Sequence, residues 1–237
     1  QMDPNLKDQT LNKLTKAENI LICAPEDSDL DHLASALALC LSIEKVGKNV
    51  QIVAKEPTVG DAKKLYGVSK IGKKNNVSNE FVVVIDNAID TVDKVSHFLD
   101  KDRLKIIIHP LAGTPGVDKS QISFEKAPKK PDFIITIGIN SFDKLKKLFA
   151  HEQNIDSNTW IVSIQKGQTG EKYAQVNVAS PDSKSYSEVT AQFLQALSLP
   201  VNEDIAFNLY SGIAAGTNNF APNLISPLTF QIASWLI

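Results

Sequence analysis

The feature that most constrains the fold is a strand–loop–helix–strand pattern near the N-terminus. Residues 19–24 (NILICA) form a compact apolar run, which is typical of a buried strand. A polar loop follows, then a helical stretch at about 32–46 that ends at Gly47, and then a second strand at 49–54. Parallel strands need such long crossover connections. We therefore expect an α/β fold, a parallel sheet with helices on both faces.

The rest of the chain fits this class, except for one segment. Residues 132–139 and 160–164 are further buried strands in this interpretation. Helices are expected at 9–16, 141–151, 185–197, 203–215 and 226–236. Four strand-like stretches without a convincing helix between them lie at 81–86, 94–99, 104–109 and 122–125. We therefore expect a single domain over 1–237 with a β-rich insertion at about 57–130, which could form one edge of the sheet.

The N-terminal βαβ unit should hold the stable core. Its apolar positions should be buried, and the residues predicted to be buried are Ile20, Leu21, Ile22, Leu37 and Leu41.

Composition excludes several classes of protein. The net charge is −2, from 25 Lys and Arg against 27 Asp and Glu, so an extended nucleic-acid-binding surface is not expected. Cys23 and Cys40 both lie in apolar runs, which is typical of reduced thiols in a core and not of a disulfide scaffold. No apolar stretch approaches membrane-spanning length, and the first residues lack the apolar region of a signal peptide. We expect a cytoplasmic protein without membrane contact.

The polar loop at residues 25–31 (PEDSDLD) is the richest candidate site. It follows a parallel strand, and open α/β sheets bind their ligands at that end of the strands. Asp29 and Asp31 alternate along the loop, so both carboxylates could reach one hard divalent cation. In the alternative interpretation, Asp31 caps the following helix and Asp29 is a solvated charge.

Four separated blocks resemble the DHH phosphoesterase family, of the RecJ-like or oligoribonuclease type. Residues 20–39 (ILICAPEDSDLDHLASALAL) are similar to its first motif, with Asp29 and Asp31 at the Asp-x-Asp positions. Residues 161–189 are similar to the block that carries the Asp-His-His triplet, and residues 132–138 to the strand that ends in a second-motif Asp. Residues 209–220 (LYSGIAAGTNNF) are similar to a Gly-Ile-x-x-Asp-Thr-x-x-Phe motif.

The chain departs from the family at most site positions. In the family, two Mn²⁺ or Mg²⁺ ions on Asp and His ligands activate a water molecule against a phosphodiester. Only Asp29 and Asp31 remain here. The positions of the other family residues are occupied by Pro25, Gly138, Gln165, Lys166, Gly167 and Gly216. Two carboxylates alone hold a hard ion poorly, so we expect the two-metal centre to be lost and any residual site at Asp29 and Asp31 to be empty.

An alternative alignment makes Asp86 the second-motif Asp and His109 a remnant of the triplet. The residues around His109 lack the Asn and Pro-Asp pattern that flanks the triplet in the family, whereas Asn177, Pro181 and Asp182 supply it after Gln165-Lys166-Gly167. The latter alignment is therefore preferred.

Three functions are open at this point. The first is a catalytically degenerate DHH-like domain that acts in interaction or assembly, with a protein partner or with itself. The second is a sensor that binds a small nucleotide or phosphate in the old cleft, and the third is an active phosphoesterase on short oligonucleotides or phosphorylated nucleosides, with Mn²⁺ or Mg²⁺. We favour the first, and then expect no cofactor. Family members usually carry a second, substrate-binding domain, which we expect this chain to lack.

Lys166 prompts one further hypothesis. If the chain follows the family fold, Lys166 ends a strand and faces the loop that carries Asp29 and Asp31. An ammonium group there would offset repulsion between the two carboxylates. We therefore expect Lys166 to replace a metal ion electrostatically, unless it is simply solvated.

Overall fold

The computed structural model describes residues 2–57, 60–72, 77–149, 155–167 and 170–237. The chain divides into two compact units, one made of residues 1–76 and 129–237, the other of Val77–Pro128. The expected β-rich insertion thus begins at residue 77 and not near 57. The stretch before it contains two short 3₁₀ helices of the first unit, η1 (Gly60–Lys64) and η2 (Val68–Lys70).

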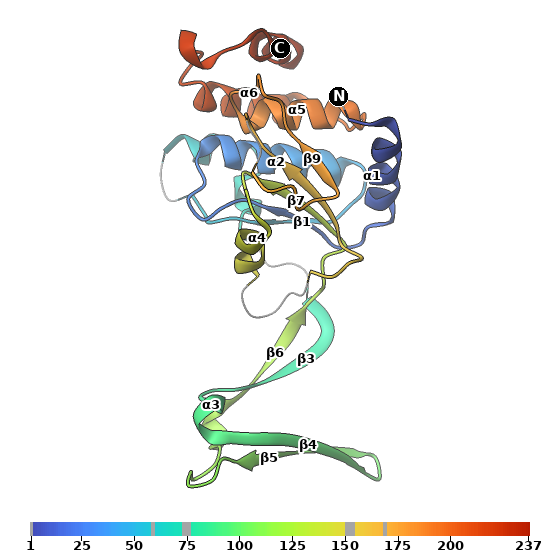
Figure 1. Ribbon diagram of the computed structural model, residues 1–237, viewed down its shortest axis with the longest axis vertical. Helices are drawn as coiled ribbons and strands as arrows, with labels where there is room; N and C mark the ends of the chain where they lie inside the picture. Colours follow the sequence, from blue (N-terminus) through green and yellow to red (C-terminus); the bar gives the residue numbers. More distant parts are fainter. Residues whose placement is uncertain (1, 58–59, 73–76, 150–154, 168–169) are drawn as a thin grey trace. The chain divides into compact units, whose positions relative to one another are not determined.

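A five-stranded parallel sheet organises the first unit, as the sequence predicts (Figure 1). Its strand order is β2-β1-β7-β8-β9, and every neighbouring pair is parallel. The strands are β1 (Ile20–Cys23), β2 (Val50–Val53), β7 (Phe133–Ile137), β8 (Trp160–Ile164) and β9 (Val176–Val178). The sequence analysis missed β9, which has only three residues and too little apolar pattern to detect.

Helices pack on both faces of this sheet, which is also as predicted. The helices of this unit are α1 (Pro4–Lys16), α2 (Leu30–Lys45), α4 (Phe142–Leu148), α5 (Tyr186–Ala196), α6 (Glu203–Gly216) and α7 (Pro227–Leu236), with a short 3₁₀ helix, η4 (Pro222–Leu224). Helix α7 packs on α5 and α6. Alternate strand residues point to opposite faces. Ile20 and Ile22 of β1 join the larger core under α2, α5 and α6, whereas Leu21 joins a smaller core with Leu145 of α4.

Capping side chains move several helix ends from their predicted positions. Helix α1 begins at Pro4, five residues earlier than expected, because the Asp3 carboxylate accepts hydrogen bonds from the backbone N–H groups of Asn5 and Leu6. Helix α4 ends at Leu148, short of the predicted residue 151. The last two residues of that prediction, 150 and 151, lie outside the described residues.

The predicted core is buried with one exception. Ile20, Leu21, Ile22 and Leu37 are all buried, at 0–1% exposure. Leu41 is only partly buried. It packs closely on Gly67, where even a Cβ atom would approach the Leu41 side chain to 3.3 Å. Cys23 and Cys40 are buried free thiols, as predicted.

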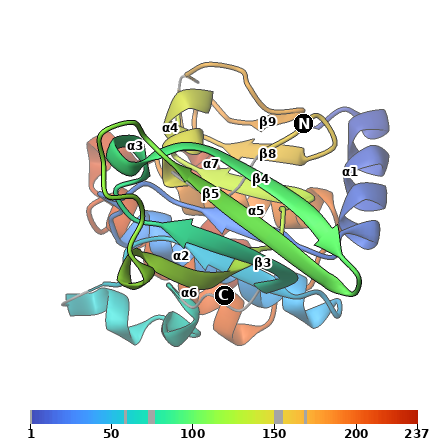
Figure 2. The same ribbon diagram turned by 90° about the horizontal axis from the view of Figure 1, so that it is seen from below.

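The second unit consists of two antiparallel ribbons (Figure 2). Its elements are β3 (Val77–Ile85), α3 (Ala88–Thr91), β4 (Val92–Asp100), β5 (Arg103–Pro110), η3 (Lys119–Gln121) and β6 (Ile122–Pro128). Strands β3 and β6 form one ribbon, and β4 and β5 form the other. The strands are therefore not an edge of the parallel sheet, whose edges are β2 and β9. No helix in the described part of the chain is long and apolar enough to cross a membrane.

Candidate functional site

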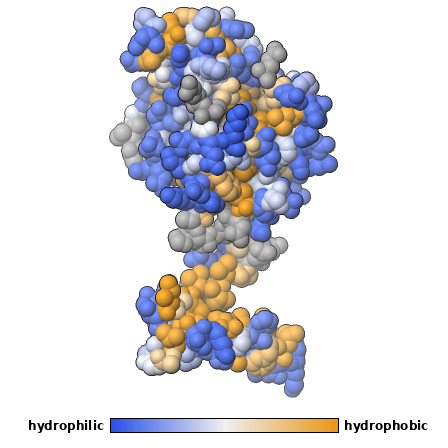
Figure 3. Space-filling view, in the orientation of Figure 1, coloured by the Kyte–Doolittle hydropathy of each residue, from blue (hydrophilic) through white to orange (hydrophobic). Residues whose placement is uncertain are grey.

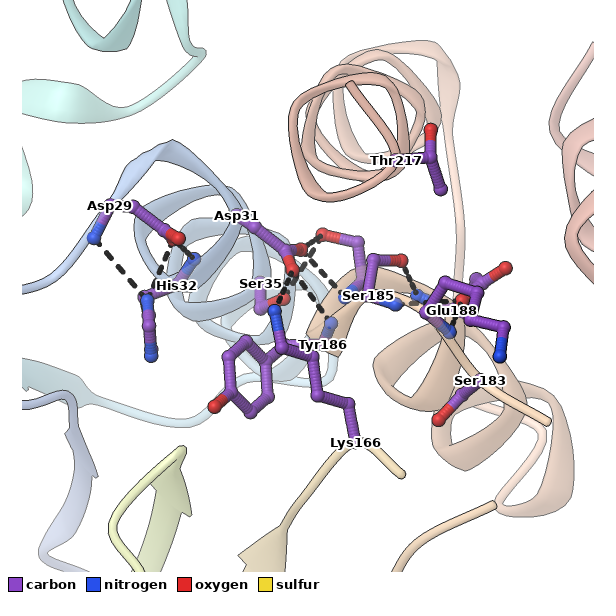
Figure 4. A network of polar contacts seen from close by, with 12 residues as sticks. Asp29, Asp31, His32, Ser35, Lys166, Ser183, Ser185, Tyr186, Glu188 and Thr217 are labelled. Atoms are coloured by element: carbon purple, nitrogen blue, oxygen red, sulfur yellow. Dashed lines mark hydrogen bonds and ion pairs between the residues drawn. The ribbon is translucent and has the colours of Figure 1, made fainter. Parts of the chain in front are cut away.

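The predicted site residues meet at the carboxyl ends of β1, β7 and β8 (Figure 4). Asp29 and Asp31 lie at the start of α2, directly after the loop that leaves β1. Gly138 follows β7, and Lys166 follows β8. Because all three strands are parallel, their carboxyl ends share one edge of the sheet, where the first turn of α5 also arrives.

Asp29 caps α2. Its carboxylate accepts a hydrogen bond from the backbone N–H of His32 at 3.0 Å, and the His32 ring contacts both the carboxylate, at 2.7 Å, and the Asp29 backbone N–H, at 3.3 Å. The hydrogen bond from His32 is the main reason that the pKa of Asp29 falls to about 2. The alternative interpretation of the sequence assigned this capping role to Asp31, which is wrong: Asp29 is the N-cap, and α2 begins at Leu30 instead of at 32.

Asp31 is completely buried and binds the start of a second helix. Its Oδ2 accepts a hydrogen bond from the backbone N–H of Tyr186 at 2.7 Å. Its Oδ1 accepts two from Ser187, from the backbone N–H at 2.9 Å and from the hydroxyl at 2.7 Å. Asp31 therefore joins the first turn of α2 to the first turn of α5, where a carboxylate also satisfies the helix dipole.

The charge of Asp31 is costly in this position. Burial raises the pKa of Asp31 to about 6, against the opposing effects of the Ser187 hydroxyl, the two backbone N–H groups and Lys166. The carboxyl group is thus poised to gain a proton at a mildly acidic pH that an exposed aspartate would not register.

Lys166 lies beside Asp31 and over an aromatic ring. Its ammonium nitrogen is 3.9 Å from Asp31 Oδ2, which is ion-pair range but longer than a hydrogen bond. The same nitrogen lies 4.6 Å from the centre of the Tyr186 ring, a cation–π distance. Asp29, in contrast, is paired with His32. The lysine therefore does not bridge the two carboxylates as a ligand would, although its charge still lowers the pKa of each.

Two of the glycines at family site positions adjoin side chains that occupy the space of the missing residue. A Cβ atom at Gly138 would lie 2.6 Å from His32 Nε2 and 2.9 Å from the Tyr186 ring. One at Gly216 would lie 2.8 Å from Asp31 Oδ2. Neither position could take an aspartate without moving its neighbours.

The remaining site positions present no anionic ligand either. Gln165 uses its amide to donate to the backbone oxygen of Ile139 at 2.6 Å. Gly167 lies beside open space, and Pro25 lines a neighbouring cavity. Among the described residues, no group of three or more His, Cys, Asp or Glu side chains could hold a metal ion. The residues present therefore do not fit a two-metal centre, which needs several anionic or imidazole ligands around each ion.

Three contributors to this cluster were not found from the sequence. The His32 and Tyr186 rings lie 4.3 Å apart between their centres, and Ser187 completes the shell around Asp31. The Asp-x-x-His spacing of Asp29 and His32 is a capping-box signal that could have identified His32. Tyr186 and Ser187 gave no such signal, because their partner Asp31 is 155 and 156 positions away.

The alternative ligands Asp86 and His109 belong to the second unit. His109 lies in β5, and its Nε2 is hydrogen-bonded to the Ser96 hydroxyl at 2.9 Å. Asp86 follows β3, where its backbone N–H donates to the Gln121 oxygen. Each therefore has a local role within the ribbons.

A cavity of about 620 Å³ adjoins the cluster. Its lining combines acidic, basic and aromatic side chains: Glu26, Asp27, His32, Lys144, Lys147 and Tyr186 among others. Two lysines of α4 and the exposed edges of two rings give it the chemistry to hold a small anion or a planar group.

Comparison with solved structures finds proteins of similar fold. The chain resembles an exopolyphosphatase-related protein from Bacteroides fragilis, with a TM-score of 0.64 and 14% identity over 99% of this chain and 56% of that one. A putative family II inorganic pyrophosphatase from Methanococcus jannaschii matches with a TM-score of 0.48 and 14% identity, over 92% and 55% of the two chains. No family model and no curated protein matches.

The chain thus spans just over half the length of these two proteins. The match to the first confirms the α/β fold, a parallel sheet with helices on both faces, that the sequence predicts. At 14% identity, it establishes the fold alone and assigns no activity.

Proposed function

We propose that this chain is a DHH-like phosphoesterase domain that has lost two-metal hydrolysis and acts in binding or assembly. The observation that supports this most directly is the environment of Asp31. Both of its carboxylate oxygens already accept hydrogen bonds from the first turn of α5, and the side chain is 0% exposed. A buried carboxylate that already accepts three hydrogen bonds stabilises a helix junction and has little capacity left for a substrate-facing ion.

Lys166 takes part of the role that positive metal ions would have at this edge of the sheet. An ammonium 3.9 Å from a buried carboxylate favours the charged form of that carboxylate. Stacking on Tyr186 holds the lysine in place without a second carboxylate. We propose that this lysine replaces a metal electrostatically at Asp31, with Asp29 compensated separately by His32.

Hydrolysis and metal binding can be tested on the same preparation. We expect no release of product from pyrophosphate, from short polyphosphate or from a dinucleotide in millimolar Mn²⁺ or Mg²⁺. Titration calorimetry with Mn²⁺ alone should show no heat above that of the matched Asp29→Asn, Asp31→Asn variant. Metal-dependent turnover that this variant lacks, while Asp27→Asn retains it, would overturn the proposal.

Occupation of the cavity beside the cluster is a second candidate function. The cavity lies at the carboxyl ends of β1 and β7, where open α/β sheets bind ligands, and Lys144 and Lys147 line it. A sensor of a phosphate or small nucleotide would use these two cations and the His32–Tyr186 ring pair. Calorimetric titration with inorganic phosphate and with adenosine monophosphate tests this directly. Binding that Lys144→Gln, Lys147→Gln abolishes and Lys146→Gln retains would favour it over a purely structural role.

A further inference from the structure

The second unit has strands but no core. None of the residues from 81 to 127 is buried, although Val, Ile, Leu and Phe fill its strands. Twelve of the nineteen exposed large hydrophobic side chains among the described residues lie within Val77–Pro128. Figure 3 shows these apolar side chains gathered over the two ribbons. An isolated two-stranded ribbon is at best marginally stable in water, so this unit needs something to cover it.

The ribbon of β4 and β5 has one aliphatic face and one mixed face, on which Phe98 and Ile107 lie among polar side chains. The register pairs Val95 with Ile108, His97 with Ile106, and Leu99 with Leu104. Residues directly opposite each other share a face. Apart from His97, the side chains of this face are therefore aliphatic, and four of them are at least half exposed: Val95 56%, Leu99 75%, Leu104 59% and Ile106 50%.

On the opposite face of the same ribbon, the polar side chains form hydrogen bonds and ion pairs with one another. Ser96 is hydrogen-bonded to His109, and Lys105 forms an ion pair with Asp100 at 2.5 Å while it lies over the Phe98 ring. Alternation of this kind is typical of an antiparallel sheet with one side in water and the other against a core. In this ribbon the polar side chains face water on one side, whereas no core covers the aliphatic face among the described residues.

The ribbon of β3 and β6 repeats the pattern. Val83 lies opposite Phe124, and Ile85 lies opposite Ile122. Phe81 is 70% exposed, Val83 41% and Phe124 72%. Together with the four aliphatic side chains of the other ribbon, these exposed fractions correspond to roughly 800 Å² per chain, which matches one partner's share of a standard interface only when both ribbons are covered.

We propose that a second copy of this chain covers these faces, with the apolar face of β4 and β5 packed on the same face of its partner. The composition of Val77–Pro128 favours a second copy of the chain over a different protein. Val77–Pro128 contains no Trp or Tyr and a single Arg, the residues that dominate contacts between different proteins. Its Val, Leu, Ile and Phe resemble a domain core cut in half, which is how obligate homodimer interfaces are built.

Charge argues against the other surfaces that could cover an apolar ribbon. The unit carries eight Asp and Glu against six Lys and Arg, so an anionic lipid surface does not attract it. It also lacks the Trp and Tyr anchors of a membrane interface. An uncharged aliphatic face complements itself, and twofold pairing uses the same patch twice. The inference rests on the second unit alone and holds whether or not the first unit hydrolyses anything.

The test measures the mass of the full chain in solution while one face at a time is changed. By analytical ultracentrifugation from nanomolar to high micromolar concentration, we expect the mass of two 25.9 kDa chains in the wild type. Leu99→Ser, Ile106→Ser should raise the dissociation constant at least a hundredfold. The matched control is Phe98→Ser, Ile107→Ser, which changes the opposite face of the same two strands and should raise it less than threefold.

A second measurement does not depend on how well the weakened ribbon folds. His97 lies at the middle of the apolar face, where a twofold axis would bring two copies together. Under mild oxidation, His97→Cys should form a disulfide-linked dimer, whereas Ser96→Cys on the opposite face should not.

A wild type that stays monomeric at high micromolar concentration would overturn the proposal. So would equal loss of association in both double variants, or crosslinking of both single cysteines. Recruitment of the monomer to phosphatidylcholine–phosphatidylserine vesicles would assign the face to a membrane instead.

Discussion

The two units of this chain are built from similar strand residues but solve the burial problem differently. In the first, strands such as β1 (ILIC) are covered on both faces by helices and are at most 1% exposed. In the second, strands such as β5 (RLKIIIHP) are as apolar in the middle, yet none of their residues is buried. An apolar strand therefore does not establish a core. What decides it is whether the chain supplies a second layer.

The largest expected difference between the units comes from matched leucine truncations. Leu37 is fully buried in the first unit and Leu99 is 75% exposed in the second. Leu37→Ala should reduce the free energy of unfolding by about 2–5 kcal/mol, from lost burial and a residual cavity. Leu99→Ala should change that of the first unit by less than about 0.5 kcal/mol. Both tryptophans, Trp160 and Trp235, lie in the first unit, so their fluorescence in urea reports that unit selectively. Equal losses would mean that the units unfold as one body.

The buried carboxyl group of Asp31 should make the stability of the first unit depend on pH. The pKa of Asp31 is about 6 in the folded state against an ordinary value of 3.8, so the folded chain holds this proton more tightly. The free energy of unfolding should therefore fall as the pH rises from about 4 to about 6, by about 3 kcal/mol from this group, and stay level above.

Substitutions at the two aspartates test that slope. Asp31→Asn should remove it, because the amide does not titrate. The matched control is Asp100→Asn, which removes a surface carboxylate of the second unit that is paired with Lys105. Urea titrations at several pH values measure it, and an unchanged slope in Asp31→Asn would contradict the cost we assign to burial.

Helix caps give a smaller contrast. Asp29 caps the sixteen-residue α2, whose interior is core, whereas Asp118 caps the three-residue η3, in which nothing is buried. Asp29→Ala should cost about 1 kcal/mol of the stability of the first unit. The Asp118→Ala variant should unfold at the same urea concentration as the wild type in the same fluorescence assay. A shift as large as that of Asp29→Ala would show that the second unit supports the first.

Removal of the whole second unit should have the smallest effect on the first. Val77 is paired with Pro128, so the two cut ends adjoin and a short Gly-Ser linker can replace 77–128. The tryptophan-monitored free energy of unfolding should change by less than about 1 kcal/mol, because the parallel sheet keeps its own core. Self-association should be lost. A deletion variant that fails to fold would show that the first unit depends on the second. One that remains a dimer would show that the first unit mediates self-association.

Most of the fold could be predicted because its signals are local. The apolar runs of β1 and β8 and the Ser-x-x-Glu box at the start of α5 each lie within a few residues. Residues 60–70 gave no such signal, since short 3₁₀ helices have neither helical nor strand periodicity, and they were wrongly assigned to the insertion.

The site was predictable in position and less so in role. Asp29 and Asp31 were found because they follow a parallel strand and match the Asp-x-Asp positions of the family, and Lys166 because it occupies the position of the family triplet. Which aspartate caps the helix and which is buried depends on where the helix begins, two residues earlier than predicted. The partners of Asp31 are fixed only when α5 docks against α2, so no local pattern could name them.

The pairing of Val77 with Pro128 also bears on how quickly the chain can fold. Strand β1 must find β7, and the Asn19–Asp132 contact beside them joins residues 113 positions apart. Strands β3 and β6 pair over only the 51 positions between Val77 and Pro128, less than half of that separation. While this pairing is in place, the chain between β1 and β7 is effectively shorter by roughly half, which lowers the loop-closure cost by about 0.6 kcal/mol. A segment that contributes no core thus brings the two core strands closer together along the chain.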